Sequence, residues 1–454
     1  MKRPITRLFI ANRSEIAVRI VKACRKLGIE TVVGVSEADR HTLAAQLADR
    51  AICIGPAPAA TSYLNMDAIV TAAKGTGCQA IHPGYGFPAE KAAFAKLCVE
   101  HGLIFVGPPA SAISGMGDKL TARETAKKLN VPVVPGTDDV RDSDAVRRHA
   151  CEIRYPFLLK ASAGGGGRGM RIVRSADEID GAFTGASAEA RAAFNDPTLY
   201  MERYVERARH VEIQVLGDEH GNLIHLGERD CSVQRRHQKL IEESPSPVVD
   251  PALRARMADA ALRLARHVSY VNAGTVEFIL DLDSMEFYFL EMNTRIQVEH
   301  PVTEMVTGID LVAEQIRIAG GEPLTVTQDV RLQGHSIECR INAEAPERNF
   351  MPSPGRITEW QAPSGSGIRV DTHCYSGYVV PPFYDSMLAK LIVHGEDRGA
   401  AIGRMANALD AFRIEGVHST LPFHRAVLAH PDFRESRVTT QWTEQDFYRE
   451  VAVA

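Results

Sequence analysis

Short apolar runs alternate with amphipathic stretches along residues 1–118. Strands are predicted at residues 8–11, 31–35, 51–54, 80–81 and 104–106. After the first run, Ile16, Ile20 and Ala23 recur at helical spacing, and Gly28 ends the pattern. This alternation predicts a doubly wound parallel sheet. Because no Gly-x-Gly-x-x-Gly sequence follows the first strand, the pattern does not support a dinucleotide fold of the dehydrogenase kind.

A small separate unit, with prolines at its entry, is predicted at about residues 133–205. Its apolar strand at 156–160 runs into four consecutive glycines within residues 163–169. Such glycines let backbone N–H groups close on phosphate oxygens, and Lys160 and Arg168 add positive charge. The Gly-Lys-Ser/Thr ending of a Walker A motif is absent. The segment is therefore interpreted either as a flap that closes over nucleotide or as a mobile surface loop.

From residue 210 onward the periodicity becomes that of antiparallel strands. In the first of them, three apolar residues alternate with three polar ones: Val211, Ile213 and Val215 with His210, Glu212 and Gln214. One face of this strand is expected to be buried and the other polar. Farther along, residues 228–239 interleave acidic and basic side chains. That run is interpreted either as a solvated helix face or as the lining of an anion site.

Two further strands are predicted to form a hairpin that carries a pair of glutamates. The strands are residues 274–280 and 287–292, and the loop is residues 282–286. Counting from the loop, residue 281 pairs with 287, 279 with 289 and 277 with 291. Glu277 and Glu291 then lie directly opposite each other, and like charges in this position destabilise a sheet. A bound divalent cation would reverse that penalty.

Asn293 follows Glu291 on the same face of the predicted strand. Glu277, Glu291 and Asn293 offer hard oxygen ligands, which suit Mg²⁺ or Mn²⁺. The alternative is a solvated polar sheet face. Three apolar neighbours argue instead for burial: Phe278, Phe289 and Leu290.

The segment 293–301 brings Arg, Gln, Glu and His side chains together beside the predicted metal site. Arg295 can hold a planar oxyanion through two parallel hydrogen bonds. Glu299 can act as a general base. Pro301 breaks any regular continuation, so a rigid loop is predicted. Considered without the metal site, the same segment would be a plain charged loop.

The composition is that of an ordinary globular enzyme. The chain has 454 residues, which predicts two or three domains, with 45% hydrophobic and 24% charged residues. Its net charge of -5 gives no broad attraction to nucleic acid or anionic membranes, so neither is expected as a partner. The eight cysteines form no C-x-x-C pair, and no apolar run is long enough for a signal peptide or a membrane span. We expect a cytoplasmic protein.

Taken together, the motifs resemble those of the biotin carboxylase family within the ATP-grasp superfamily. The matching segments are Ile10-Ala11-Asn12-Arg13, His82-Pro83-Gly84-Tyr85-Gly86-Phe87, Met116-Gly117-Asp118-Lys119, Lys160-Ala161-Ser162 with the glycines after it, Arg235-Arg236-His237-Gln238-Lys239, Glu291 to Pro301, and Glu338-Cys339-Arg340-Ile341-Asn342. The resemblance covers nearly the whole chain, in order. It implies a mixed α/β and α+β multidomain protein with an ATP-grasp fold. The implied parts are an N-terminal doubly wound parallel-sheet domain at 1–118, an ATP-grasp domain at 119–330 with a mobile lid at about 133–205, and a C-terminal biotin carboxylase domain at 331–454.

The resemblance also implies roles for individual residues. Lys119 and Lys160 match phosphate-binding lysines, with Gly166 and Gly167 in the lid loop. Glu202, Arg203, Tyr204 and Val205 match the hinge that binds adenine, and His210, Gln234 and His237 resemble further nucleotide contacts. Glu277, Glu291 and Asn293 match metal ligands, and Lys239, Arg295, Gln297 and Val298 match the bicarbonate pocket. Glu299 resembles the base that deprotonates bicarbonate, Arg340 the residue that stabilises the biotin enolate, and Tyr85 a residue lining the biotin pocket.

The implied reaction has two stages. Deprotonated bicarbonate attacks the γ-phosphate of ATP, with Mg²⁺ or Mn²⁺ at two sites, and gives carboxyphosphate. This intermediate breaks down to CO₂ and phosphate, and the phosphate takes the ureido proton of biotin, which is a carrier-bound substrate. Phosphoryl transfer of this kind depends on positioning and charge neutralisation, which the motifs provide.

The sequence departs from the family pattern in two places in its first 100 residues. Ser14 stands where the family has Gly. After Phe87, Pro88, Ala89 and Lys91 replace the usual residues, and only Glu90 remains. These changes bear on the packing and interface of the N-terminal domain, as does Lys26. In the hinge, Arg203 occupies a position that is often Lys.

Partners follow from the resemblance and from one absent motif. The familiar biotin-attachment motif is Met-Lys-Met, and the only Met-Lys pair here is Met1-Lys2. We therefore expect a separate biotin carboxyl carrier protein, a carboxyltransferase partner and a homodimer. The carboxyltransferase selects the final acceptor, for which an acyl-CoA is the first expectation and pyruvate or urea stay open. Two rival functions are another ATP-grasp ligase, which makes an acyl phosphate for attack by an amine, and a degenerate nucleotide-binding regulatory protein.

Overall fold

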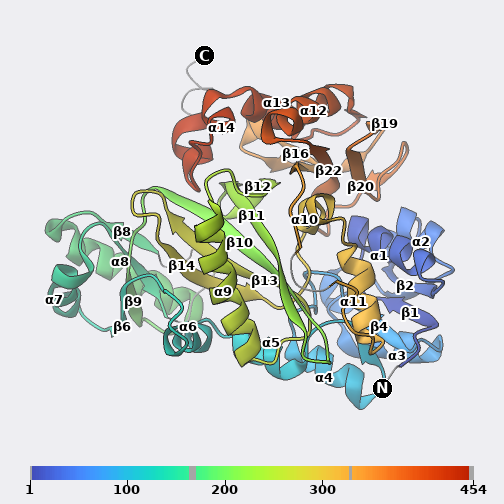
Figure 1. Ribbon diagram of the computed structural model, residues 1–454, viewed down its shortest axis with the longest axis horizontal. Helices are drawn as coiled ribbons and strands as arrows, with labels where there is room; N and C mark the ends of the chain where they lie inside the picture. The colour runs from blue at the N-terminus through green and yellow to red at the C-terminus, as the bar shows by residue number, and fades with distance from the viewer. Residues whose placement is uncertain (1–2, 163–169, 327–329, 449–454) are drawn as a thin grey trace.

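The N-terminal sheet of the computed structural model, which describes residues 3–162, 170–326 and 330–448, has five parallel strands (Figure 1). In spatial order they are β3 (Arg50–Gly55), β2 (Glu30–Ser36), β1 (Arg7–Ile10), β4 (Ala80–His82) and β5 (Ile104–Phe105). The accompanying helices are α1 (Ser14–Lys26), α2 (Leu43–Leu47), α3 (Met66–Gly75), α4 (Ala92–Glu100) and α5 (Ala110–Gly117). The predicted parallel sheet is confirmed, and α1 buries the predicted apolar face of Ile16, Ile20 and Ala23.

The strand order of this sheet reverses between β1 and β4, where open parallel sheets bind ligands at their carboxyl edge. Asn12 follows β1, and its side-chain amide donates to the carbonyl oxygens of Pro83 and Tyr85, each at 2.7 Å. Gly84 between them has φ +62, and a Cβ there would lie 2.8 Å from the Asn12 amide nitrogen. The bond network therefore needs glycine at this position and holds the Tyr85 backbone in place.

A second sheet belongs to the small unit at about residues 133–205. Its order is β6 (Gly136–Val140), β9 (Leu199–Arg203), β7 (Phe157–Ala161) and β8 (Arg171–Val173). Helices α7 (Ser143–Ile153) and α8 (Ile179–Phe194) pack against it around their own buried cluster, which includes Phe157 and Met201. In Figure 1 this unit lies at one end of the molecule, away from the N-terminal sheet.

The third sheet has eight antiparallel strands and forms the centre of the molecule. Its order is β14 (Phe287–Asn293), β13 (Asn272–Asp281), β10 (Ala208–Gly217), β11 (Leu223–Arg235), β12 (Gln238–Ser244), β15 (His335–Asn342), β22 (Met387–Gly395) and β20 (Ile368–Thr372). Associated helices are α6 (Lys119–Lys128), α9 (Pro251–His267), α10 (His300–Thr307), α11 (Leu311–Ala319), α12 (Arg398–Ala411), α13 (Leu421–Ala429) and α14 (Pro431–Arg434). Short strands β16 (Glu344–Ala345), β17 (Met351–Pro352), β18 (Gly355–Arg356), β19 (Glu359–Gln361), β21 (Val379–Val380) and β23 (Arg413–Glu415) complete the C-terminal part. None of the helices in the described ranges is long and apolar enough to cross a membrane.

The structure adds one point about β10 and excludes the helix alternative for residues 228–239. The polar face of β10 is not solvated, because Glu212 and Gln214 are fully buried and His210 nearly so. Residues 228–239 do not form a helix; they are the hairpin of β11 and β12, with Arg236 and His237 in its turn at positive φ. In both places, charged side chains of neighbouring strands neutralise one another inside the protein. The hydrophobic pattern of a single strand cannot reveal such contacts, because it does not show which strands are neighbours.

The β13–β14 hairpin confirms the pairing of Glu277 with Glu291 but not the register nearest the loop. Leu280 pairs with Phe287 and Phe278 with Phe289, so each is one residue away from the prediction. A bulge at Leu290 restores the predicted register before Glu291. The bulge also turns the Leu290 side chain outward, where it is 41% exposed instead of buried.

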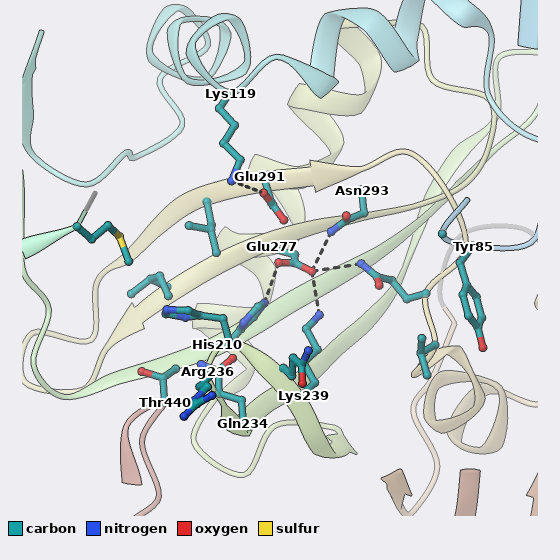
Figure 2. A pocket seen from close by; sticks show the side chains of 18 of the residues that line it. Tyr85, Lys119, His210, Gln234, Arg236, Lys239, Glu277, Glu291, Asn293 and Thr440 are labelled. Carbon is teal, nitrogen blue, oxygen red and sulfur yellow. Dashed lines mark hydrogen bonds and ion pairs between the residues drawn. The ribbon is translucent and has the colours of Figure 1, made fainter. Parts of the chain in front are cut away.

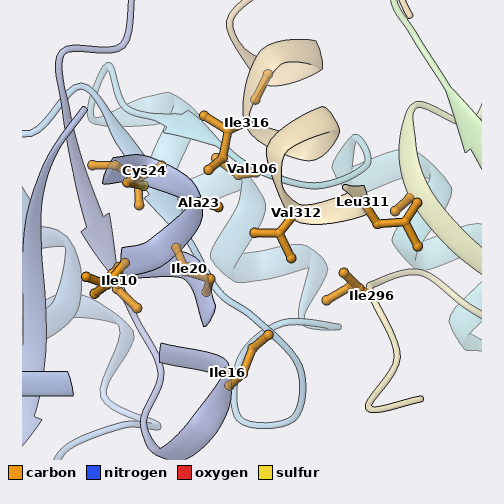
Figure 3. Close-up of a cluster of buried hydrophobic side chains, with 14 of the residues drawn as sticks. Ile10, Ile16, Ile20, Ala23, Cys24, Val106, Ile296, Leu311, Val312 and Ile316 are labelled. Atoms are coloured by element: carbon orange, nitrogen blue, oxygen red, sulfur yellow. The ribbon is translucent and has the colours of Figure 1, made fainter. Parts of the chain in front are cut away.

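The N-terminal sheet is joined to the rest of the protein by a shared apolar core (Figure 3). Side chains from the N-terminal part meet side chains from α11 and from the loop before α10: Ile10, Ile16, Ile20, Ala23, Cys24 and Val106 against Ile296, Leu311, Val312 and Ile316. Ile296 is fully buried there and lies inside the predicted catalytic segment 293–301. The packing of α1 therefore fixes the position of that segment.

Phe278 tests how much the hairpin depends on its apolar face. It is fully buried and packs edge-on against Phe287, with ring centroids 5.3 Å apart. We expect Phe278→Ala to reduce the free energy of unfolding by about 3–5 kcal/mol, because it leaves a cavity in the core. Chemical denaturation measures the change. The control Leu290→Ala, on the exposed bulge of the same hairpin, should stay within about 0.5 kcal/mol; an equal loss in both variants would contradict the assigned packing.

Candidate active site

One large cavity lies where the N-terminal sheet, the small unit and the central sheet meet (Figure 2). Its volume is about 1730 Å³, which exceeds that of most small-molecule sites and is enough for more than one substrate. Many of the sequence-predicted residues line it: Tyr85, Lys119, Lys160, Glu202, Arg203, Tyr204, Val205, His210, Gln234, His237, Lys239, Glu277, Glu291, Asn293, Arg295, Gln297, Val298 and Arg340. The fold thus gathers segments that are far apart in the sequence around one space.

Among the described residues, one predicted site residue is not part of this lining. Glu299 is fully buried beneath the surface of the cavity and contacts two of its lining residues, Lys239 and Arg340. Gly166 and Gly167 lie outside the described residues.

Lys239 is the centre of the electrostatics of the site. Its Nζ lies 2.7 Å from Glu212 Oε2, 2.8 Å from Glu277 Oε1 and 2.6 Å from Glu299 Oε1. Burial by itself would lower the pKa of Lys239, but the three carboxylates outweigh it and raise the pKa well above the ordinary value. One ammonium group therefore holds together three strands or loops that each bring a buried carboxylate.

Glu212 is a site residue that the sequence reasoning missed, since it was assigned only to the polar face of a strand. The β10–β13 register puts Glu212 directly opposite Glu277. Its other oxygen accepts a hydrogen bond from the buried guanidinium of Arg229. A signal was available in the sequence, because Glu212 follows the predicted nucleotide contact His210 by two residues on the same face.

Glu299 ends the loop before α10 and connects Lys239 with Arg340. Burial would raise its pKa, but Lys239 and Arg340 together lower it well below the usual range. Its Oε2 lies 2.9 Å from Arg340 Nη2. Glu299 is therefore an ionised carboxylate held by two cations.

Arg340 projects from β15 and is bonded on its other side to Glu242, with 2.6 Å from Nε to Glu242 Oε1. Burial would lower the pKa of Arg340, but Glu242 and Glu299 raise it. Glu242 also went unrecognised in the sequence, where it follows two apolar residues of β12. The arginine thus reaches the cavity while its position is fixed by two buried carboxylates.

Arg295 is oriented by the N-terminal domain as well as by its own loop. Its Nε donates to Glu90 Oε2 at 2.8 Å, its Nη1 to Gln297 Oε1 at 3.0 Å and its Nη2 to Asn293 Oδ1 at 3.2 Å. Glu90 also accepts from the backbone N–H of Thr294 at 3.2 Å. The one family residue kept after Phe87 therefore supports the predicted bicarbonate loop.

The predicted metal ligands lie together on β13 and β14 and are in contact with protein cations. Glu277 Oε2 lies 3.0 Å from His210 Nε2, and Glu291 Oε2 lies 3.3 Å from Lys119 Nζ. The Asn293 amide donates to Glu277 Oε1 at 2.9 Å. Two carboxylates and an amide oxygen next to each other are a donor set that fits Mg²⁺ or Mn²⁺, so the residues present suit the ion.

The opposite end of the cavity is built from β7, β9 and α6. Glu202 on β9 contacts both Lys160 of β7 and Arg123 of α6. Burial, and then the positive charges of Arg123 and Lys119, lower the pKa of Lys160 to about 8. Several cations facing one space make this end attractive to a polyphosphate.

Ser14, where the family pattern has Gly, lies at the cavity edge near Tyr85. Its backbone has φ +59, a conformation that costs a residue with a side chain on the order of 1 kcal/mol. Its hydroxyl accepts a hydrogen bond from Arg13 Nη1 at 2.7 Å, and the Arg13 guanidinium is held by Asp39 at 2.8 Å. The Tyr85 hydroxyl donates to Glu15. Ser14 is thus accommodated within the buried network at the start of α1.

Three family models match successive parts of the chain. They are described as "Biotin carboxylase, N-terminal domain" over residues 4–113, "Carbamoyl-phosphate synthase L chain, ATP binding domain" over 118–327, and "Biotin carboxylase C-terminal domain" over 338–445. Together they cover most of its length.

Individual relatives match over nearly their whole length. "Biotin carboxylase 1" of Bacillus subtilis is 55% identical over 443 residues, which are 97% of this chain and 98% of that protein. A pyruvate carboxylase component of Methanothermobacter thermautotrophicus is 52% identical, covering 97% of this chain and 90% of that protein. A crystal structure of the biotin carboxylase domain dimer of Hydrogenobacter thermophilus 2-oxoglutarate carboxylase, with MgADP, ADP and bicarbonate, matches with a TM-score of 0.90 and 47% identity over 98% of each chain.

Lys239→Met tests the central role of the ammonium group. Above the ordinary carboxylate pKa of about 4.5, Lys239 stabilises ionised Glu277 and Glu299, whose pKa values are depressed in the folded protein. That stabilisation is lost as the pH falls through the folded pKa values. We therefore expect the free energy of unfolding of Lys239→Met to be about 3–5 kcal/mol below that of the wild type near neutral pH. The difference should become smaller in acid. Chemical denaturation at several pH values measures it.

The matched control is Lys96→Met, because Lys96 is 73% exposed and pairs with Glu100 on the surface of α4. It should change stability little at any pH. A deficit in Lys239→Met that does not vary with pH would assign its effect to packing instead of charge.

Proposed function

Since the chain belongs to the biotin carboxylase family of ATP-dependent ligases, we propose that its cavity binds MgATP, bicarbonate and carrier-bound biotin side by side and carboxylates the biotin. The observation that carries this proposal is the chain of contacts from Lys239 through Glu299 to Arg340. It connects Lys239, which contacts the proposed metal ligand Glu277, with Arg340, which also lines the cavity. Glu299, the proposed base of the first stage, thus contacts Arg340, which is assigned to the second stage.

In the first stage, we assign Lys239, Arg295, Gln297 and the backbone of Val298 to bicarbonate. Arg295 presents a planar guanidinium that can bind the anion through two parallel hydrogen bonds. Glu299 takes the bicarbonate proton, and a bicarbonate oxygen attacks the γ-phosphorus while ADP leaves. The product of this step is carboxyphosphate. Lys119 and Lys160 neutralise the charge of the transferred phosphoryl group and of the departing ADP.

The low pKa of Glu299 has a direct consequence for this step. A carboxylate held by Lys239 and Arg340 is a weak base. Bicarbonate is an anion and competes with Glu299 for Lys239, and this competition raises the pKa of Glu299 when substrate is bound. The base thus gains proton affinity only when bicarbonate is present.

In the second stage, carboxyphosphate breaks down to CO₂ and phosphate beside Arg340. The phosphate takes the N–H proton of the ureido group, and the ureido nitrogen then forms the new bond to the CO₂ carbon. The negative charge that develops on the ureido oxygen is stabilised by the Arg340 guanidinium. Tyr85 lines the space where the biotin ring would lie.

Glu277, Glu291 and Asn293 would hold Mg²⁺ or Mn²⁺, at two sites. The ions would neutralise phosphate charge and orient the triphosphate. Their binding would displace the ammonium of Lys119 from Glu291 and free it for phosphate. Lys119 would thus contact Glu291 when no metal ion is bound and the nucleotide phosphates when one is bound.

The nucleotide is proposed to extend from these ligands toward the small unit. Glu202, Arg203, Tyr204 and Val205 form the connection at the end of β9 and would bind adenine, with His210, Gln234 and His237 nearby. We propose that the small unit closes over the nucleotide as a lid, and that domain boundaries fall near residues 118 and 330. The continuous pairing of β12 with β15 supports a rigid body beneath this lid.

We also propose a separate carrier protein, a carboxyltransferase partner, a homodimer and an acyl-CoA as final acceptor. The dimer is supported by the relative described as a biotin carboxylase domain dimer. Relatives named for pyruvate and 2-oxoglutarate carboxylases match this chain about as well as those named simply biotin carboxylase. We infer that the residues of this cavity act before the carboxyl group reaches its final acceptor. Assays with each candidate acceptor and the purified partner proteins would identify that acceptor.

The reaction itself predicts ATP turnover that requires both bicarbonate and biotin. Arg295→Ala and Glu299→Gln should both remain folded, with Glu299→Gln less stable because it removes the charge that Lys239 and Arg340 contact. Both should lose more than about 100-fold in this turnover, because they remove the anion contact and the base. Release of phosphate is the measurement. Turnover that responds to an amine in place of biotin would indicate a different ATP-grasp ligase. A loss of thermal stability without a loss of turnover would make the loop structural.

Glu291→Gln tests the metal assignment. The substitution removes one anionic ligand, so turnover at ordinary Mg²⁺ concentrations should fall by more than about tenfold and partly recover at higher Mg²⁺. The control Glu286→Gln alters an exposed glutamate of the same hairpin, paired with Arg256, and should leave turnover unchanged. Normal turnover by Glu291→Gln at low Mg²⁺ would contradict the assignment.

A further inference from the structure

Two carboxyl groups face each other behind Arg340. The β12–β15 register places Glu242 directly opposite Glu338, and both side chains are fully buried. The opposite face of β15, with Ile337, Cys339 and Ile341, packs into the apolar core of the C-terminal part. Like charges directly opposite each other destabilise a sheet, and more so when neither is in contact with water.

The hydrogen bonds of this pair are incomplete. Glu242 uses Oε1 to accept from Arg340, whereas its Oε2 has no partner among the described residues. Both oxygens of Glu338 are likewise unpartnered within the described ranges. Three acceptor oxygens thus lie on two neighbouring side chains, and the part of the chain that the structure describes supplies no donor for any of them.

A buried carboxylate without hydrogen bonds does not stay ionised, because the cost of desolvating the charge exceeds the cost of binding a proton. One proton placed between the two side chains turns Glu338 into a donor. Its O–H then matches the free Glu242 Oε2 and leaves Glu242 as the anion that faces Arg340. A second negative charge at Glu338 would repel Glu242 and compete with it for Arg340.

We propose that Glu242 and Glu338 share a single proton as an acid–carboxylate pair, and that the pair positions Arg340 for its reaction with biotin. The second half of this inference rests on the proposed function, in which Arg340 stabilises the charge on the ureido oxygen. Glu338 is accordingly a positioning residue that acts through Glu242 and does not contact substrate.

The charged groups around the pair are consistent with one proton. Lys390 of β22 is fully buried opposite Arg340, but its Nζ is already committed to the Val298 carbonyl oxygen at 2.8 Å and to Glu15 at 3.5 Å. Glu299 adds a negative charge from the loop before α10. Burial raises the pKa of Glu338 well above its ordinary value, and the negative charges of Glu242 and Glu299 raise it further, against the lowering by Lys390 and Arg340.

The same balance acts on Glu242. Burial raises its pKa, Arg340 lowers it and Glu299 raises it, with a result of about 7. His300, at the start of the covering helix α10, contributes no positive charge, because burial and nearby cations hold its pKa well below the ordinary value. Glu338 is therefore the member of the pair that keeps the proton at neutral pH.

The first experiment is pH-dependent unfolding of Glu338→Gln, which mimics the neutral acid. A group with a raised pKa in the folded state stabilises the protein at low pH and loses this contribution as the pH rises. The variant should match the wild type near pH 5 and unfold at higher denaturant concentration than the wild type near about pH 9. A variant less stable than the wild type at alkaline pH would mean that Glu338 is ionised and would overturn the shared proton.

Glu243→Gln is the matched control, because Glu243 is the next residue on β12 and is also buried. Burial would raise its pKa, but His335 and Arg398 lower it to about 2. Its substitution should destabilise the protein at alkaline pH, which is the opposite sign to that of Glu338→Gln. Infrared difference spectra provide a direct readout: the carbonyl band of a protonated carboxylic acid should be present in the wild type and lost in Glu338→Gln. Its absence from the wild type would also overturn the shared proton.

The second experiment tests the positioning of Arg340. Glu338→Gln should keep kcat/KM for biotin within about twofold, whereas Glu338→Leu should lower it about tenfold and leave KM for ATP unchanged. Equal losses in both variants, or no loss in either, would overturn the positioning role. The unfolding and infrared measurements need no turnover, so they decide on the shared proton even if the proposed function fails.

Discussion

A single buried ammonium group, that of Lys239, holds together three buried carboxylates beside the large cavity. Glu212 comes from β10, Glu277 from β13 and Glu299 from the loop before α10, and all three lie within 2.8 Å of the same Nζ. Each carboxylate would be unstable at its position without that charge. Two strands and the end of a loop are thus held by one side chain. The proposed metal ligand Glu277 and the proposed base Glu299 both depend on its charge.

Other cations that face the cavity are likewise paired with carboxylates. Lys119 pairs with Glu291, Lys160 with Glu202 and Arg295 with Glu90. These pairs keep the cleft from accumulating unbalanced charge, which a partly buried site does not tolerate. Under the proposed function, an anionic substrate would have to replace a carboxylate at each of these cations. Substrate binding would then release carboxylates, which could bind metal ions or protons.

Much of the fold could be predicted from periodicity, because the N-terminal strands are short apolar runs separated by an amphipathic helix such as α1. The opposition of Glu277 and Glu291 also followed from counting along a hairpin. The bulge at Leu290 did not, since it inserts one residue without any signal in the pattern. Local counting succeeds where partners are close in sequence and fails where the backbone departs from regular pairing.

Glu212, Glu242 and Glu90 were missed for a different reason. Each acts through a partner distant in the chain: Glu90 through Arg295 and Glu242 through Arg340. A charged residue in an expected strand looks solvated until the strands beside it are known. Glu212 and Glu242 are instead fully buried, because neighbouring strands bring the cations that neutralise them. The motifs were enough to name many of the residues that line the cavity, whereas the buried carboxylates that support them depend on tertiary pairing.

The position of the proposed bicarbonate loop, residues 293–301, shows how far that support extends. Ile296 fixes the loop in the apolar core shared by α1 and α11, and Glu90 holds its Arg295 and Thr294 from the N-terminal side. Both contacts come from the part of the chain that departs from the family pattern, at Ser14 and around Glu90. One of these contacts is apolar packing and the other is charged, so both kinds of interaction hold the loop from the N-terminal side. The geometry of the proposed bicarbonate loop therefore depends on the packing of α1 as well as on the charge of Glu90.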